Sequence, residues 1–252
     1  MSTMSALLYR GEPTRPDESG RGKPDVRVAF LFFVVFYGFL GVGVCLFGRI
    51  TPPPRPDIGM PQIQSWYDQH ALMIQIGLSV LLLVAGGAAI SNGLIGYHMK
   101  RMSSGKTLAY GYIGGMAVGA IPGFQLILIC YLLAVFREDR DPEVSRMFYD
   151  LGMLSYNGSL GCFTAAYFSL AVAIFYDKNN IFPKWFAYVT IWQIVTEVIA
   201  TQMFLFESGA FSWNGLIAFW TAVIVFTAWL AFLIPILRVA GQREPIDSPP
   251  VT

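Results

Sequence analysis

Residues 108–136 read LAYGYIGGMAVGAIPGFQLILICYLLAVF and contain no charged side chain. The hydrocarbon core of a bilayer is about 30 Å thick, so a helix needs roughly 20 apolar residues to cross it. This stretch is longer than that. Its apolar residues are continuous rather than alternating, which excludes a strand of an outer-membrane barrel. The sequence therefore predicts a membrane-spanning helix here.

The composition of the whole chain supports the same class. Of the 252 residues, 55% are hydrophobic and only 13% are charged, whereas soluble domains carry about 25% charged residues. The net charge of +1 gives no reason to expect a nucleic-acid partner. The three cysteines all lie in apolar runs and predict neither a disulfide nor a metal site, and no cofactor is implied. No sequence motif of the common hydrolases, kinases or dehydrogenases is present.

Six apolar segments are long enough to span a membrane, so we predict an all-α fold, a polytopic membrane helical bundle with a transmembrane domain at 27–240. The spans are expected near Val28–Phe47, Ala71–Ile95, Leu108–Phe136, Met153–Phe175, Trp185–Phe206 and Gly215–Ala240. Residues 1–26 and 241–252 are polar and are expected to be flexible tails. Twelve Lys and Arg residues fall on the side of the two termini and five on the other side. This bias predicts that both termini are cytoplasmic.

Glycine recurs at every fourth position of the third span, at Gly111, Gly115, Gly119 and Gly123. In a bilayer, small residues let two helix backbones approach closely, and this approach holds helices together. We therefore expect this glycine stripe to be a packing surface.

Pro122 lies within the same span. A proline inside a helix removes a backbone hydrogen bond and bends the helix. Backbone groups freed at membrane depth need partners, and we expect Gln125 and Tyr131 to supply them.

Glu197 is the only acidic residue inside a predicted span. A charge at a helix centre costs on the order of 2.5–3.5 kcal/mol, so we expect this carboxyl group to stay protonated. Thr190, Gln193 and Thr201 fall within one narrow arc with it, at about 100° per residue, and that arc should face other helices or a cavity. Two interpretations remain open: an acid poised for proton donation, ligand anchoring or ion coupling, or a neutral residue bonded to a neighbouring helix.

Other polar residues at membrane depth could meet Glu197. They lie on the third and fourth spans and at the start of the sixth. We name Glu197 as the candidate catalytic residue, and as candidate ligand-binding residues Gln193, Thr201, Gln125, Tyr156, Asn157, Tyr167 and Asn214.

The two histidines lie near opposite ends of the second span. At 1.5 Å per residue they are roughly 42 Å apart, so His70 and His98 cannot share a metal or a haem. His98 neighbours Lys100 and Arg101 and is expected to be solvated at the cytoplasmic surface.

Three segments resemble an uncharacterised group of bacterial, largely actinobacterial, membrane proteins. They read DLG (150–152), FPKWFAY (182–188) and FSWNGLIAFW (211–220). The resemblance covers mainly the C-terminal 100 residues. It implies a six-helix integral membrane fold in the inner (plasma) membrane of a bacterium, and it implies no activity.

Three functions are compatible with these observations. The first is binding, and perhaps conversion, of a lipophilic small molecule such as an isoprenoid or sterol-like compound in an intramembrane cavity near Glu197. The second is a non-catalytic subunit that associates with a membrane protein partner or with itself. The third is a proton-coupled transporter, for which the chain offers no internal repeat.

The charge bias can be tested with topology reporters. Fusions at residue 252 and within residues 52–58 should report opposite sides of the membrane, with the C-terminal fusion in the cytoplasm. Signals from the same side would overturn the prediction of six spans.

Overall fold

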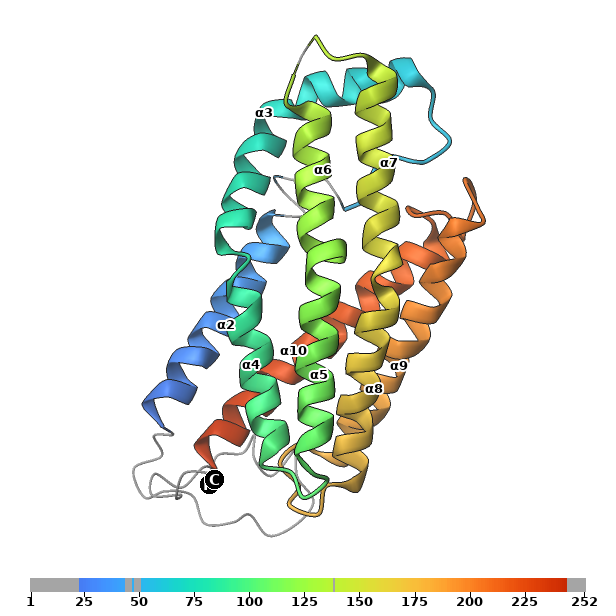
Figure 1. Cartoon of the computed structure of the whole chain (residues 1–252). Coiled ribbons are helices and arrows are strands. Elements are labelled where there is room, and N and C mark those ends of the chain that lie inside the picture. The colour runs from blue at the N-terminus through green and yellow to red at the C-terminus, as the bar shows by residue number, and fades with distance from the viewer. Residues whose placement is uncertain (1–22, 44–46, 48–50, 138, 244–252) are drawn as a thin grey trace.

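The computed structural model describes residues 23–43, 47, 51–137 and 139–243, and this part of the chain is helical and contains no strand. The helices form an elongated bundle (Figure 1). In chain order they are α2 (Pro24–Val42), α3 (Met60–Val84), α4 (Gly87–Lys100), α5 (Lys106–Gly119), the π-helix η2 (Ala120–Gln125), α6 (Leu126–Val135), α7 (Pro142–Gly158), α8 (Leu160–Tyr176), α9 (Lys184–Ala200), the 3₁₀-helix η3 (Thr201–Phe204), the π-helix η4 (Leu216–Trp220) and α10 (Thr221–Gln242).

Sequential segments run up and down the bundle. The start of α2 and the end of α10 lie at the same end of it (Figure 1). The closest helix pairs are α5 with α8, α8 with α9 and α6 with α7. An even number of passages through the bundle therefore separates the two ends of the described chain.

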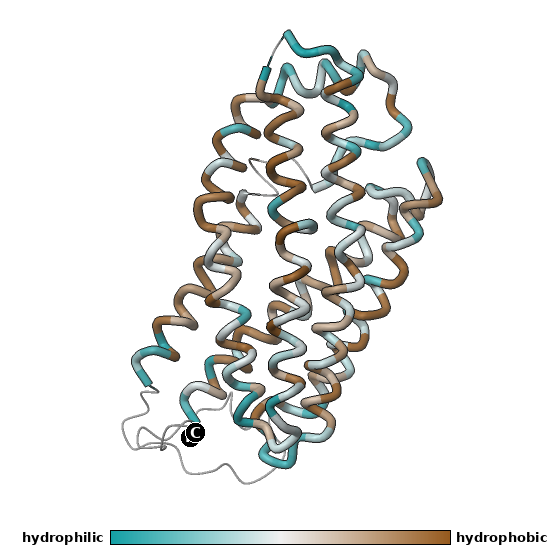
Figure 2. The backbone as a smooth tube through the Cα atoms, viewed as in Figure 1, coloured by the Kyte–Doolittle hydropathy of each residue, from teal (hydrophilic) through white to brown (hydrophobic). Residues whose placement is uncertain are grey.

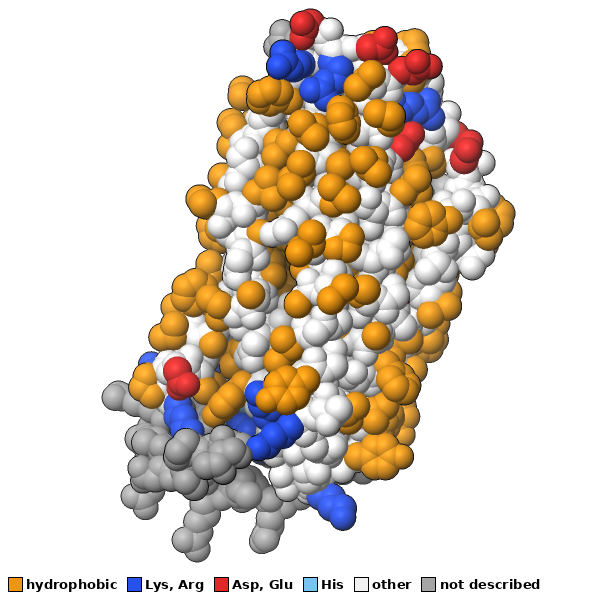
Figure 3. Space-filling view, in the orientation of Figure 1, with side chains coloured by type: hydrophobic (Ala, Val, Ile, Leu, Met, Phe, Trp, Pro, Cys, Tyr) orange, Lys and Arg blue, Asp and Glu red, His pale blue; other side chains and the backbone are white. Residues whose placement is uncertain are grey.

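In the part of the chain that the structure describes, five helical segments are long and apolar enough to cross a membrane, which indicates a multi-pass membrane protein. They are Pro24–Val42, Met60–Val84, Lys106–Val135, Pro142–Tyr176 and Leu216–Gln242. Apolar residues predominate along the length of the bundle, and hydrophilic residues gather at its ends (Figure 2). On the face shown in Figure 3, Lys, Arg, Asp and Glu side chains lie at the two ends, with hydrophobic side chains between them. The fifth predicted span corresponds to α9, which is 17 residues long and continues directly into η3.

Two predicted spans differ from the helices observed. The second is divided, because α3 ends at Val84 and α4 begins at Gly87. The fourth begins at Pro142 rather than near Met153, because Asp141 caps this helix by accepting a hydrogen bond from the Glu143 N–H at 2.8 Å, and proline suits the first helical position. Helix also extends slightly into both predicted tails, and the rest of those tails lies outside the described residues.

The glycine stripe is confirmed as a packing surface, and its partner lies within the same chain. A methyl group placed on Gly115 would lie 2.8 Å from the Cys162 carbonyl oxygen, and one on Gly119 would lie 2.7 Å from the Phe163 ring. Gly111 and Gly123 face the Ser169 and Ser159 hydroxyl groups in the same way. The α5–η2 segment therefore packs on α8 at a distance that only glycine permits.

The chain passes Pro122 through the π-helix η2 rather than through a break. The wider turn accommodates a proline without ending the helix. The predicted hydrogen-bond partners are wrong. The Tyr131 hydroxyl group is buried without a partner, and Gln125 is exposed. Gln125 follows the packed Gly123 by two residues, about 200° around the helix, so it points away from α8.

Substitution of Gly115 tests the close approach of α5 and α8. Gly115→Leu should lower the yield and the thermal stability of the folded protein, because a side chain there forces two backbones apart. Gly114→Leu is the matched control, since nothing lies within 4 Å of a methyl group at Gly114. Equal stability of the two variants, measured by thermal unfolding in detergent, would contradict this packing.

Candidate functional site

Helix α9 carries the polar face that the sequence places around Glu197. The helix starts after Pro183, where the Lys184 ammonium group donates hydrogen bonds to carbonyl oxygens at the end of α8, among them that of Phe175 at 3.0 Å. From this fixed start, helical periodicity turns Thr190, Gln193 and Glu197 into the bundle, where all three are buried.

Glu197 and Gln193 form a hydrogen-bonded pair. Gln193 Nε2 donates to Glu197 Oε1 at 2.7 Å. The Glu197 side chain is 8% exposed, and the described residues offer it no other hydrogen bond and no cation. The carbonyl oxygen of Gln193, Oε1, is buried without a hydrogen-bond partner. The pair can therefore accept a further hydrogen bond at Gln193 Oε1, and it can donate one from the Glu197 carboxyl group when that group is protonated.

Aromatic side chains connect the polar face of α9 with the helices packed against it. Helices α8 and α10 both pack against α9. Tyr167 of α8 is buried and packs edge-on against Trp229 of α10, with ring centroids 5.3 Å apart. The Trp229 indole N–H donates to the Thr190 hydroxyl group at 3.1 Å, so this ring joins α8 and α10 to the polar face of α9. Tyr156 of α7 is 41% exposed.

Sequence analysis missed three polar residues that extend this region. Tyr112 of α5 belongs to the same buried cluster as Tyr167, and Tyr37 of α2 packs against that cluster. The Tyr112 hydroxyl group donates to Asn92 Oδ1 at 3.1 Å. A carboxamide inside a predicted span was a usable signal, because polar groups at membrane depth are rare and need partners, and Asn92 was such a residue.

Thr201 does not belong to the site, which corrects the predicted arc. Its side chain is exposed, and its hydroxyl group donates to the Val198 carbonyl oxygen at 2.7 Å. The α-helix ends at Ala200 and continues with 3₁₀ geometry, which has 3.0 residues per turn. A rotation of 100° per residue therefore applies only up to Ala200, and it does not predict the direction of the Thr201 side chain.

Asn157 is buried, but its contacts lie within its own helix. Its Nδ2 donates to the Met153 carbonyl oxygen at 2.9 Å, and its Oδ1 has no hydrogen-bond partner. No hydrogen bond among the described residues connects Asn157 with Glu197. Gln125 is exposed and is likewise not part of the interior cluster.

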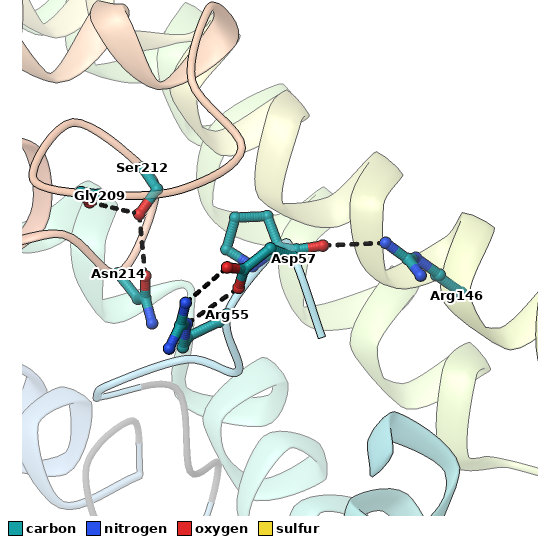
Figure 4. A network of polar contacts seen from close by, with 7 residues as sticks. Arg55, Asp57, Arg146, Gly209, Ser212 and Asn214 are labelled. Carbon is teal, nitrogen blue, oxygen red and sulfur yellow. Dashed lines mark hydrogen bonds and ion pairs between the residues drawn. The ribbon is translucent and has the colours of Figure 1, made fainter. Parts of the chain in front are cut away.

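Asn214 lies in a different place, in a polar network formed by the loops at the far end of the bundle from the start of α2 (Figure 4). It accepts a hydrogen bond from the Ser212 hydroxyl group at 3.0 Å. In the neighbouring loop, Arg55 Nε donates to Asp57 at 2.9 Å, and this hydrogen bond lowers the pKa of Asp57. The Arg146 guanidinium group donates to the Pro56 carbonyl oxygen at 2.9 Å.

The proline-rich loop is fixed at the same end by aromatic donors. The Tyr149 hydroxyl group and the Trp213 indole N–H both donate to the Pro54 carbonyl oxygen, at 3.0 and 2.8 Å. The rings of Tyr149 and Trp213 meet edge-on, with centroids 5.8 Å apart. The polar and aromatic residues around Asn214 therefore hold the proline-rich loop in place, and they are separate from Glu197 and Gln193.

His98 is buried rather than solvated, so that expectation is wrong. It has no exposed surface, its Nδ1 is 2.8 Å from an Arg101 guanidinium nitrogen, and its ring packs near Phe182. The same Arg101 nitrogen donates to the Ala240 carbonyl oxygen at 3.0 Å. His98 is thus buried among residues from other parts of the chain, and the sequence next to His98 does not predict those contacts.

An apolar hollow of about 240 Å³ lies between α2 and α3, away from Glu197. It is lined by Phe39, Val42, Gly43, Phe47, Ile76, Gly77, Val80 and Leu81. It contains no polar side chain that could orient a ligand, and we assign no role to it.

Comparison with protein-family models, with curated proteins and with solved structures finds no match to this chain. A functional assignment therefore depends on the chemistry of the site alone.

The protonation state of Glu197 can be tested directly. We expect a neutral carboxyl group at pH 7, because the group is buried and no described cation pairs with it. Infrared spectra recorded between pH 5 and 8 should show a protonated-carboxyl band that is absent from the Glu197→Gln variant. A carboxylate throughout this range would contradict the expectation and would favour a water-filled pathway.

Substitutions at this position should differ in their effect on folding. Glu197→Gln should fold, since it keeps the shape and the hydrogen-bonding capacity of the side chain. Glu197→Lys should fail to accumulate, because a buried ammonium group lacks a counter-charge. Normal accumulation of the lysine variant, measured by yield and size-exclusion chromatography, would contradict this prediction.

Proposed function

We propose that this chain is a six-span protein of a bacterial inner (plasma) membrane with both termini in the cytoplasm. The shared end of α2 and α10 (Figure 1) and the excess of Lys and Arg on that side support this topology. The segment from Lys184 to Phe204 supports the sixth crossing, because at 1.5 Å per residue it reaches roughly 30 Å. The resemblance of the C-terminal third to bacterial membrane proteins supports the location.

Within this membrane, we propose that the protein binds a lipophilic small molecule of isoprenoid or sterol-like character at Glu197 and Gln193. One observation carries the proposal: the side-chain amide oxygen of Gln193, Oε1, is buried without a partner beside a carboxyl group that has a single hydrogen bond. Leaving a buried acceptor unpaired costs about 1–3 kcal/mol. A ligand with a polar end would recover this free energy.

The surroundings of the pair favour an apolar ligand that arrives from the bilayer. Glu197 keeps a small exposed surface, 8%, so the pair is not completely closed off from the outside of the bundle. Trp229 and Tyr167 provide aromatic surface beside it. Because Gln193 Oε1 is fully covered in this conformation, its side chain must rotate when a ligand binds. As a second step we propose isomerisation of an alkene: protonated Glu197 donates its proton to one alkene carbon, and the resulting carboxylate takes a proton from a carbon next to the cation, so that the double bond moves and the acid is regenerated.

Co-purified lipids provide the test. Wild-type protein extracted from its native membrane should carry a lipophilic compound, detectable by mass spectrometry of an organic extract. Glu197→Gln and Gln193→Met should reduce its occupancy by about tenfold or more, because the first replaces the acidic O–H donor by an amide and the second removes the carboxamide. Thr201→Val is the matched control on the same helix, since Thr201 is exposed, and it should keep the compound.

The outcomes separate the alternatives. Equal occupancy in wild type and Glu197→Gln would overturn the assignment of the site. A wild-type extract without any bound compound would overturn the binding function and favour a non-catalytic subunit of a membrane complex.

A further inference from the structure

Gln125 is an exposed carboxamide within the membrane-spanning part of the bundle. It is the last residue of η2, and no described residue hydrogen-bonds to its side chain. It lies about 15 Å along the helix from Val135 and about 28 Å from Lys106, at 1.5 Å per residue. A 30 Å hydrocarbon core centred on this segment would therefore enclose the amide.

The surface around Gln125 is apolar. Val118 is 64% exposed, Ile121 67% and Ile129 44%, and their spacing places them on one face of the α5–η2–α6 segment with Gln125. This segment lies on the face turned to the viewer in Figures 1 and 3, where hydrophobic side chains cover the region between the charged ends. Lipid tails offer no hydrogen-bond partner, so an amide here is left unsatisfied by the bilayer.

We propose that Gln125 is the centre of a contact between two copies of this chain. A carboxamide is self-complementary, because its N–H donates and its carbonyl oxygen accepts, so two glutamines can satisfy one another. All copies of a multi-pass protein enter the membrane in the same orientation, which places Gln125 of each copy at the same depth. A two-fold axis normal to the membrane therefore brings the two amides together without further adjustment.

The flanking side chains complete the contact. Ile121 and Ile129 lie about one turn to either side of Gln125 and would pack across the axis, while the amide pair fixes the register. Polar side chains of this type stabilise helix association in membranes, and the apolar stripe supplies the van der Waals surface around them. The contact does not involve Glu197, so it is independent of the proposed ligand site.

Cysteine cross-linking in native membranes tests the position of the contact. In a background with Cys45, Cys130 and Cys162 changed to alanine, Gln125→Cys should form a disulfide-linked dimer of this chain on mild oxidation. Ile224→Cys is the matched control: Ile224 is 63% exposed on α10, a helix that lies behind α5 and α6 in Figure 1, and it should remain monomeric. Equal cross-linking at both positions, or cross-linking of position 125 to a different protein, would overturn the proposal.

Dimer affinity provides the second measurement. Single-molecule photobleaching of labelled protein in lipid vesicles should show dimers that dissociate as the protein is diluted. Gln125→Leu should weaken the dimer about threefold to thirtyfold, and Gln125→Asn should weaken it less, because it keeps the amide. Thermal stability of the monomer should be unchanged, since no described residue hydrogen-bonds to the Gln125 side chain. A wild-type protein that stays monomeric at high density in the vesicles would overturn the proposal.

Discussion

The close approach of α5 to α8 is the contact on which the rest of the bundle depends. Four glycines along α5 and η2 face the Cys162 carbonyl oxygen, the Phe163 ring and two serine hydroxyl groups of the facing helix segment. In a bilayer, burial of leucine gives little association energy, so backbone contacts of this kind hold the helices together. Because α8 in turn packs along α9, this contact also helps to position the helix that carries Glu197.

Three of the helical segments change their helix type along their length. The third segment passes through a π-helix at Pro122, α9 becomes a 3₁₀-helix at Thr201, and α10 begins as a π-helix. Such changes shift which residues face the core, and π-helical turns occur frequently at functional sites. Here Thr201, which begins the 3₁₀-helix, lies outside the site, whereas Glu197 and Gln193, about one and two turns earlier on α9, stay within it.

Two glutamine side chains lie at membrane depth without a full set of hydrogen-bond partners. Gln193 Oε1 is buried inside the bundle without a donor, and Gln125 is exposed on a face that hydrocarbon should surround. Either amide is costly if it is left unsatisfied at membrane depth. The first is explained by a ligand at Glu197 and the second by another copy of the chain, and the two explanations can fail separately.

The sequence by itself determined the class of the protein, because 55% hydrophobic residues with 13% charged residues cannot cover a water-soluble surface. It also determined the glycine stripe and the burial of Gln193 and Glu197, because a spacing of about 100° per residue holds throughout a regular helix.

Tertiary structure decided what depends on neighbouring helices or on a change of helix type. It placed Thr201 and Gln125 on the outside, assigned Asn214 to a loop network and buried His98. It also packed Tyr112 and Tyr37 into the cluster that contains Tyr167, and paired Tyr112 with Asn92. Periodicity describes one helix at a time. Which residues of different helices meet depends on how closely the backbones approach, and the sequence alone does not give that distance.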